Sequence, residues 1–176
     1  MTRQWQFALV GVKGFPQTKS LLSELMNIQH ILVPVDFSES TPSSIAYALE
    51  LAGKFAARIT LYHVLQLMNP PGLDPVFTFE KEISALQDKT EKQLRELAGS
   101  IAPMVEVDTA MDSGVPWDCV VNRADNYGVD LIVIGTHGRS GLKHLFLGSV
   151  AERVVRHAPC AVLVVRARRS LTPSNS

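Results

Sequence analysis

The sequence has little that would indicate a secreted, membrane or nucleic-acid-binding protein. It contains two cysteines in 176 residues, Cys119 and Cys160, and neither belongs to a CxxC motif or a metal-ligand spacing. Lysine plus arginine and aspartate plus glutamate balance at 17 each, so no basic excess would attract nucleic acid. No apolar run approaches the roughly 20 residues that cross a bilayer. We therefore expect a soluble cytoplasmic protein with reduced thiols and neither a nucleic-acid nor a membrane partner.

Several familiar functional motifs are also missing. There is no GxxxxGK[ST], which argues against an ordinary P-loop hydrolase, and no GxGxxG after the first expected strand, which argues against a dinucleotide dehydrogenase. His30, His63 and His157 are spread over separate elements without ligand spacing, so we expect no protein metal site. No pairing of a nucleophile with a base is evident either. Catalysis is therefore the less favoured interpretation, and any hydrolysis should be slow.

From His30 onwards, strand patterns alternate with helix patterns. This alternation predicts an α/β fold with a doubly wound parallel sheet and helices on both faces. The long helix expected over 79–97 could bind a partner, but its apolar stripe of Ile83, Leu86, Leu94 and Leu97 is the ordinary signature of a helix that packs on its own sheet. The strands are expected over 31–35, 58–64, 105–111, 131–134 and 161–165, and the helices over 42–56, 79–97, 116–127 and 149–157.

The two ends of the chain differ in composition from this alternating region. Residues 1–26 have no acidic side chain before Glu24, and the apolar stretch from Phe7 to Val12 is interrupted by Gly11. A secretory signal is disfavoured because that stretch is short and no convincing cleavage site follows it. We expect residues 1–26 to form a poorly ordered leader, residues 27–167 to form the domain, and residues 168–176 to form a flexible tail.

The residues that follow the first and fourth strands have the chemistry of an anion site. Asp36 follows the first strand, Gly135 and Gly138 follow the fourth, and Gly148-Ser149 begins the last helix. Ligands of open parallel sheets bind beyond the carboxyl ends of the strands. Glycines let backbone N–H groups approach a ligand closely, and the free amides at a helix N-terminus favour an anion. Together these residues predict a cradle for phosphate.

Each of these features also has a purely structural explanation. The glycines could simply serve tight turns. Asp36, with Ser38 and Ser40 after it, could form an Asx turn or cap the following helix. Ser149 followed by Glu152 fits a capping box. From the residues alone these alternatives stay open, and a capping role does not exclude a phosphate role.

The glycine spacing resembles that of one known family. Gly135-x2-Gly138-x9-Gly148-Ser149 matches the G-x2-G-x9-G-[ST] signature of ATP-binding universal stress proteins. The Ile31-Leu32-Val33-Pro34-Val35-Asp36 segment is similar to their first strand, and the order of elements agrees from about residue 27 to residue 166. The resemblance implies the adenine nucleotide alpha hydrolase-like fold, with five parallel strands in the order 3-2-1-4-5. It also implies that ATP, or AMP or ADP, binds between the first and fourth strands.

The resemblance assigns a role to individual positions. Pro34, Val35 and Asp36 would border the adenine and ribose, and Val64 would pack on the adenine. The ribose and the phosphates would be held by Gly135, Thr136, Gly138, Arg139, Gly148, Ser149 and Val150. Val150 would act through its backbone amide alone. Any Mg²⁺ would arrive with the bound phosphates.

The last strand, Ala161 to Val165, carries no charge before Arg166. In the implied order it lies at an edge of the sheet, where an uncharged apolar strand needs cover. The resemblance implies a homodimer through this strand, with Val162 and Val164 paired across a two-fold axis, whereas a tail folded back over the strand is the alternative. Three functions stay open. The first is a homodimer that binds and senses ATP and changes its interactions with an unknown protein partner under stress. The others are a slow ATPase and a dimeric stress protein that binds no nucleotide.

Overall fold

The computed structural model describes residues 27–66, 79–136 and 147–166, with side chains from residue 83 onwards in the second range. The expected leader and tail, together with Gly138 and Arg139, lie outside the described residues. The elements run in the order β1 (His30–Pro34), α2 (Thr41–Phe55), β2 (Arg58–Leu65), α3 (Phe79–Ile101), β3 (Val107–Ser113), α4 (Pro116–Asn126), β4 (Leu131–Gly135), α5 (Ser149–His157) and β5 (Ala161–Val165).

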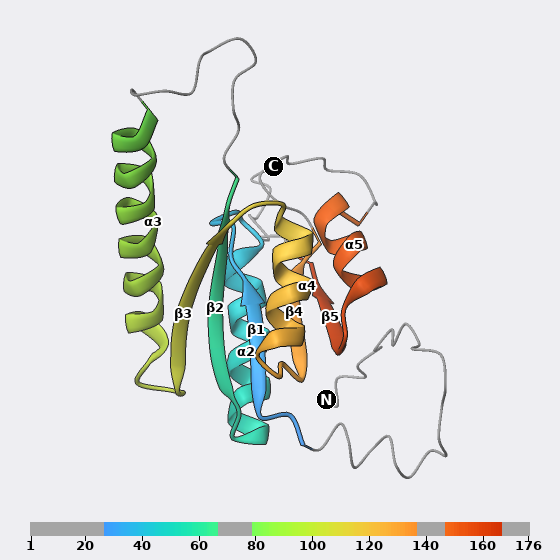
Figure 1. Ribbon diagram of the computed structural model, residues 1–176. Helices are drawn as coiled ribbons and strands as arrows, with labels where there is room; N and C mark the ends of the chain where they lie inside the picture. Colours follow the sequence, from blue (N-terminus) through green and yellow to red (C-terminus); the bar gives the residue numbers. More distant parts are fainter. Residues whose placement is uncertain (1–26, 67–78, 137–146, 167–176) are drawn as a thin grey trace, which may run out of the picture.

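The strands form one parallel sheet in the order β3-β2-β1-β4-β5, which confirms the predicted order (Figure 1). Ile31 of β1 lies opposite Ile59 of β2 on one side and Leu131 of β4 on the other. β1 is therefore central, and the chain leaves it towards β2 on one side and later returns to β4 on the other. Beyond them, β3 pairs with β2 and β5 with β4, so β3 and β5 are the edges.

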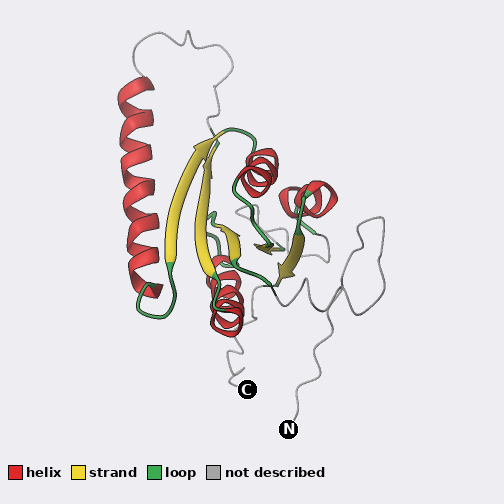
Figure 2. Cartoon of the chain, turned by 60° about the horizontal axis from the view of Figure 1, so that its bottom comes forward, coloured by secondary structure: helices red, strands yellow, loops and turns green. Residues whose placement is uncertain are grey.

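Helices cover both faces of the sheet, as the alternation predicted (Figure 2). Successive side chains of a strand point to opposite faces. Ile31 and Val33 therefore pack in the cluster that contains residues of α2 and α3, whereas Leu32 packs in the cluster that contains residues of α4 and α5. All three side chains are fully buried. The central strand thus contributes to two cores, which fixes its position.

The long helix α3 differs from its predicted packing. The buried side chains are Thr90, Leu94, Ala98 and Ile101, which recur at steps of three and four residues, whereas Leu86 is 47% exposed. A helix of 23 residues is about 35 Å long and a strand of seven residues about 23 Å. The helix is therefore longer than the strand beside it, which explains why the apolar stripe is not buried along its full length. The prediction that Leu86 faces the sheet was wrong.

Two general expectations about the chain can also be compared with the fold. None of the helices in the described part of the chain is long and apolar enough to cross a membrane. Cys119 and Cys160 are free and partly buried. Burial raises the pKa of the Cys160 thiol to about 11, and it also raises the pKa of the Cys119 thiol. Both thiols are therefore protonated, unreactive groups at neutral pH.

Candidate functional site

The site predicted from the sequence lies where β1 and β4 end. These two strands are neighbours, yet the chain winds away from them in opposite directions. Ligands of open parallel sheets usually bind at such a point, because the connections that follow the two strands diverge there. The residues after β1, after β4 and at the start of α5 therefore decide what this edge of the sheet can bind.

The end of β1 is fixed by the backbone of Val35. Its N–H donates a hydrogen bond of 2.7 Å to the Tyr62 carbonyl oxygen, and its carbonyl oxygen accepts one of 2.6 Å from Nδ1 of His63. The side chain of Val35 is buried in the core on the α2 and α3 face. Pro34, just before it, is half-buried and has no backbone N–H to donate. Val35 thus shapes the site through its position more than through free polar groups.

Asp36 organises the turn that leads to α2. Its Oδ1 accepts hydrogen bonds from the backbone N–H of Ser38 at 3.0 Å and from Oγ1 of Thr41 at 3.2 Å. The first of these confirms the Asx turn considered from the sequence. Between Asp36 and Ser38 the chain bends sharply at Phe37, which has a φ of 58°. The Asp36 carboxylate is therefore held in a defined orientation at the end of the central strand.

At the end of β4, Gly135 lies against the first turn of α2. A Cβ placed on Gly135 would lie 2.7 Å from Cβ of Ser40, closer than real Cβ atoms come to their neighbours. The glycine therefore has a packing reason that is independent of any ligand. The next residue, Thr136, is buried, and its N–H donates a hydrogen bond of 2.8 Å to the Val165 carbonyl oxygen of β5.

The start of α5 is tied back to β4. The N–H of Gly148 donates a hydrogen bond of 2.8 Å to the Thr136 carbonyl oxygen, and the Gly148 carbonyl accepts from the N–H of Glu152 at 2.9 Å. Gly148 is thus the N-cap residue, and no side chain caps the helix. The capping-box interpretation of Ser149 and Glu152 was wrong, because Ser149 is already inside the helix and Glu152 pairs with Arg156 at 2.8 Å.

This arrangement changes which amides are free. Gly148 was expected to present its N–H to a phosphate, but that N–H is already used by Thr136. The first N–H groups inside a helix have no intrahelical acceptor. In the described part of the chain, no hydrogen bond from the amides of Ser149, Val150 or Ala151 is found. N–H groups of this kind, together with the positive end of the helix dipole, favour a negatively charged group.

Val64, the predicted adenine contact, is half-buried near the end of β2 and packs against the core on the α4 and α5 face. Sequence reasoning missed its neighbour His63, which is buried, bonds Val35 and lies with its ring centroid 5.1 Å from that of Phe37. A polar residue near the end of an apolar strand was the available signal. Among the described residues, no group of three acidic, histidine or cysteine side chains could hold a metal ion.

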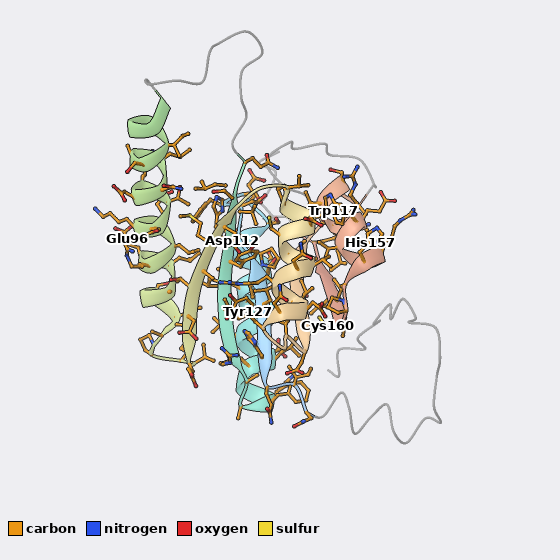
Figure 3. The ribbon with its side chains drawn as sticks, in the orientation of Figure 1. Glu96, Asp112, Trp117, Tyr127, His157 and Cys160 are labelled. Atoms are coloured by element: carbon orange, nitrogen blue, oxygen red, sulfur yellow. The ribbon has the colours of Figure 1, made fainter. Side chains whose placement is uncertain are left out.

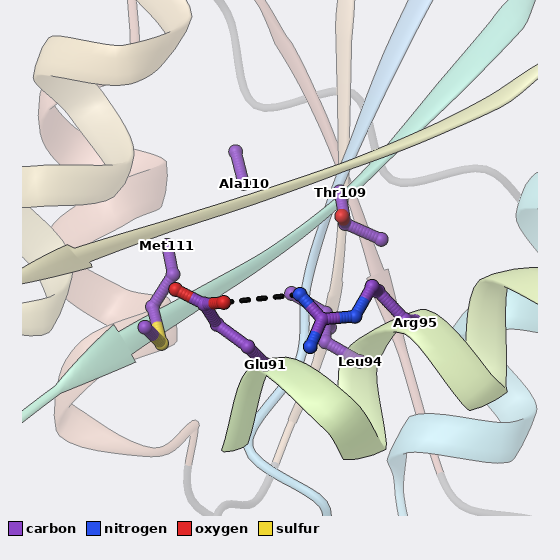
Figure 4. A pocket seen from close by; sticks show the side chains of 6 residues that line it. All are labelled: Glu91, Leu94, Arg95, Thr109, Ala110 and Met111. Carbon is purple, nitrogen blue, oxygen red and sulfur yellow. Dashed lines mark hydrogen bonds and ion pairs between the residues drawn. The ribbon is translucent and has the colours of Figure 1, made fainter. Parts of the chain in front are cut away.

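A separate hollow of about 250 Å³ lies between α3 and β3 (Figure 4). Its lining includes an ion pair of 3.0 Å between Glu91 and Arg95, and Leu94 and Met111 supply apolar walls. Because β3 is separated from β4 by β2 and β1, this hollow does not belong to the site at the ends of β1 and β4.

Comparisons with known proteins agree with this geometry. Residues 27–166 match the model of the universal stress protein family. The chain belongs to the universal stress protein family. A universal stress protein of Methanocaldococcus jannaschii is 33% identical over 161 residues, which cover 91% of this chain and 95% of that relative.

Solved structures of universal stress proteins share the fold. The protein UspA of Lactobacillus plantarum is 28% identical, with a TM-score of 0.70 over 80% of this chain and 99% of its own. A universal stress protein solved in complex with cAMP is 25% identical, with a TM-score of 0.56 over 81% of this chain and 99% of its own. The fold is therefore the one implied by the glycine spacing, and at least one relative binds an adenine nucleotide.

Proposed function

We propose that this universal stress protein binds an adenine nucleotide, ATP or its di- or monophosphate, at the carboxyl ends of β1 and β4. The observation that carries the proposal is the junction of β4 and α5. The hydrogen bond between Thr136 and Gly148 holds the free amides of Ser149 and Val150 at the carboxyl end of β4. Donors in this position suit the phosphates of a nucleotide whose adenosine lies over the end of β1.

The described residues divide between the two halves of such a ligand. Pro34, Val35 and Asp36 border the ribose and base, and Val64 packs on the adenine. Gly135 and Thr136 lie beneath the ribose and the α-phosphate, while Ser149 and Val150 donate to the outer phosphates. Gly148 fixes the helix start. Gly138 and Arg139 complete the phosphate cradle in this proposal, although they lie outside the described residues. Mg²⁺ binds with the phosphates rather than to protein ligands.

The proposed role is binding and sensing in the cytoplasm, not catalysis. Hydrolysis of ATP needs a group that positions or activates water near the γ-phosphate. Asp36 is the acidic side chain at the site, and its Oδ1 is already bonded to Ser38 and Thr41. The bound nucleotide instead changes the surface presented to a protein partner.

A homodimer through β5 completes the proposal. β5 is an edge strand of five residues, Ala161–Val165, without a charged side chain. Its first four side chains are only half-buried in the single chain. Apolar edges of this kind need cover, and a second copy of β5 supplies it with matching length and hydrophobicity.

The proposal is tested by analysing what the purified full-length protein carries. The protein is denatured, and the released small molecules are identified by chromatography and mass spectrometry. Protein stripped of ligand is then titrated with ATP in a calorimeter, and ATP loss is followed for hours. Release of an adenine nucleotide, or saturable ATP binding with little turnover, supports the proposal. No release and no heat of binding would overturn it, and rapid turnover would favour the ATPase.

A further inference from the structure

A second polar pocket lies at the opposite end of the sheet, among the first residues of β1, β2 and β3. It has a volume of about 160 Å³, and its lining includes His30, Arg58, Thr60, Asp108, Arg123 and Tyr127. Figure 3 shows the C-terminal end of α4, marked by Tyr127, near the starts of these strands. The proposed nucleotide site uses none of these residues, so the pocket needs its own explanation.

Arg123 is held firmly but is poorly paired. Its guanidinium carbon lies 4.2 Å from the ring centroid of Tyr127 and 5.2 Å from that of Tyr62. Only 18% of its side chain is exposed. Its ion pair with Asp112 spans 3.9 Å, which is beyond hydrogen-bond distance, and the described part of the chain contains no hydrogen bond to its guanidinium. A fixed, mostly buried guanidinium with unused donors favours an anion.

Arg58 is also only loosely paired. Its guanidinium lies 3.6 Å from the carboxylate of Asp108, and its Nη2 lies 3.0 Å from Nδ1 of His30. The same Nδ1 lies 3.2 Å from the Tyr127 carbonyl oxygen, and a single ring nitrogen cannot serve both partners at once.

This competition makes Arg58 easy to release. If Arg58 turns away, Nδ1–H of His30 donates to the Tyr127 carbonyl, and Nε2 accepts from Oγ1 of Thr60, which lies 2.8 Å away. Every polar atom of the buried ring is then satisfied without Arg58. Burial and the charge of Arg58 both lower the pKa of His30, so the ring is neutral in the folded protein and able to adopt this tautomer.

We infer that this pocket binds a phosphate-sized oxyanion between the guanidinium groups of Arg58 and Arg123. Guanidinium groups bind phosphate oxygens in a bidentate manner. The pocket has room for about five water molecules, which is enough for one phosphate group. Asp108 opposes the ligand, because its carboxylate occupies Arg58 and repels a second negative charge. The anion therefore displaces Asp108 from Arg58 when it binds.

The test is a titration of the ¹⁵N-labelled protein with inorganic phosphate at constant ionic strength, followed by NMR. We expect saturable shifts of the amides of Thr60, Ala110 and Tyr127. The amides of Ser149 and Val150 report the nucleotide site separately, so phosphate bound there is recognised as such. A parallel titration with glycerol phosphate shows whether the pocket prefers a free phosphate ion or a phosphate ester. The preferred ligand class is the one that binds more tightly.

Three variants and one control make the outcome decisive. Arg123→Gln and Arg58→Gln should each weaken binding about tenfold or more, whereas Asp108→Asn should tighten it several-fold. Arg156→Gln, which removes an exposed arginine paired with Glu152, should change nothing. If Arg123→Gln fails to fold, Arg58→Gln and Asp108→Asn still decide whether the anion binds in this pocket. No saturable shift around the pocket, or equal binding by the wild type, Arg58→Gln and Asp108→Asn, would overturn the inference.

Discussion

The backbone N–H of Gly148 donates a hydrogen bond of 2.8 Å to the carbonyl oxygen of Thr136. This bond joins the start of α5 to the end of β4. The amide of Gly148 is therefore already bonded within the protein, whereas the amides of Ser149 and Val150 remain available for a ligand.

The first prediction follows for hydrogen exchange. In nucleotide-free protein the Gly148 amide should exchange slowly, whereas the Ser149 and Val150 amides should exchange fast because they have no acceptor. Saturating ATP should slow exchange at Ser149 and Val150 at least tenfold and leave Gly148 nearly unchanged. Amide-resolved exchange by NMR measures this, and slow exchange at all three amides before ATP is added would contradict the geometry.

The second prediction concerns the close contact of Gly135 with Ser40. Gly135→Ala should lower the free energy of unfolding by about 1–3 kcal/mol, since the added methyl group overpacks the contact. Ser40→Gly in the same chain should recover most of that loss. The matched control is Gly53→Ala in α2, where nothing lies within 4 Å of the new Cβ, and there a gain of about 0.5–1 kcal/mol is expected. Urea unfolding of the variants measures these changes, and additive effects of Gly135→Ala and Ser40→Gly would refute the contact.

The third prediction is a loss of stability in mild acid caused by His30. Burial, with the charge of Arg58 adding to it, lowers the pKa of His30 below its usual 6.5. The unfolded chain then binds the proton more readily than the folded chain. The contribution of neutral His30 to the free energy of unfolding is therefore complete above pH 6.5, and it is lost as the pH falls through the folded-state pKa. His30→Asn should flatten this part of the pH dependence of the free energy of unfolding.

The control for that experiment is His157→Gln, because His157 is exposed at the end of α5. Urea unfolding at several pH values between 7.5 and 5 compares the slopes of the two variants with that of the wild type. Equal slopes for His30→Asn and the wild type would show that His30 does not control the acid response.

The fourth prediction tests the dimer proposed at β5. Val164→Glu places a charge within the apolar edge strand, so it should convert a dimer into a monomer. Light scattering coupled to size exclusion measures the mass, and far-ultraviolet circular dichroism checks the fold. Val155→Glu on α5 is the control for a charge at another half-buried position and should leave the dimer intact. A wild-type protein that is monomeric at high concentration would end the proposal.

The fold was predictable because it depends on patterns that repeat along the chain. Apolar strands that alternate with amphipathic helices indicate a parallel sheet, and the glycine spacing resembled one family, which implied the strand order. The burial of α3 was less predictable. Thr90 is buried and Leu86 is 47% exposed, because packing depends on how far the helix extends beside β3 and not on hydrophobicity alone.

The places of the candidate site residues in the fold could be predicted, but their contacts could not. The positions of Asp36, Gly135 and Ser149 at the strand ends and the helix start follow from element order. Their hydrogen bonds do not, because a bond such as that of Gly148 to Thr136 joins residues from two elements whose relative position only the fold fixes. The pocket around Arg123 was missed for the same reason, since its residues come from β1, β2, β3 and α4.

Ser149→Pro tests most directly whether the amides at the start of α5 hold the phosphates of an adenine nucleotide, as proposed. Proline is tolerated as the first residue of a helix, and the preceding Gly148 already has the extended conformation that proline requires, with a φ of −59° and a ψ of 149°. This variant therefore keeps the helix while it removes both the N–H and the hydroxyl of residue 149.

Ser149→Ala is the matched variant, because it removes only the hydroxyl. A hydrogen bond to a charged group contributes about 1.5–3 kcal/mol, so calorimetric titration with ATP should show binding by Ser149→Pro that is about 10- to 100-fold weaker than binding by Ser149→Ala. Equal ATP affinity of the two variants, with both of them folded, would show that the amide of residue 149 does not bind the phosphates.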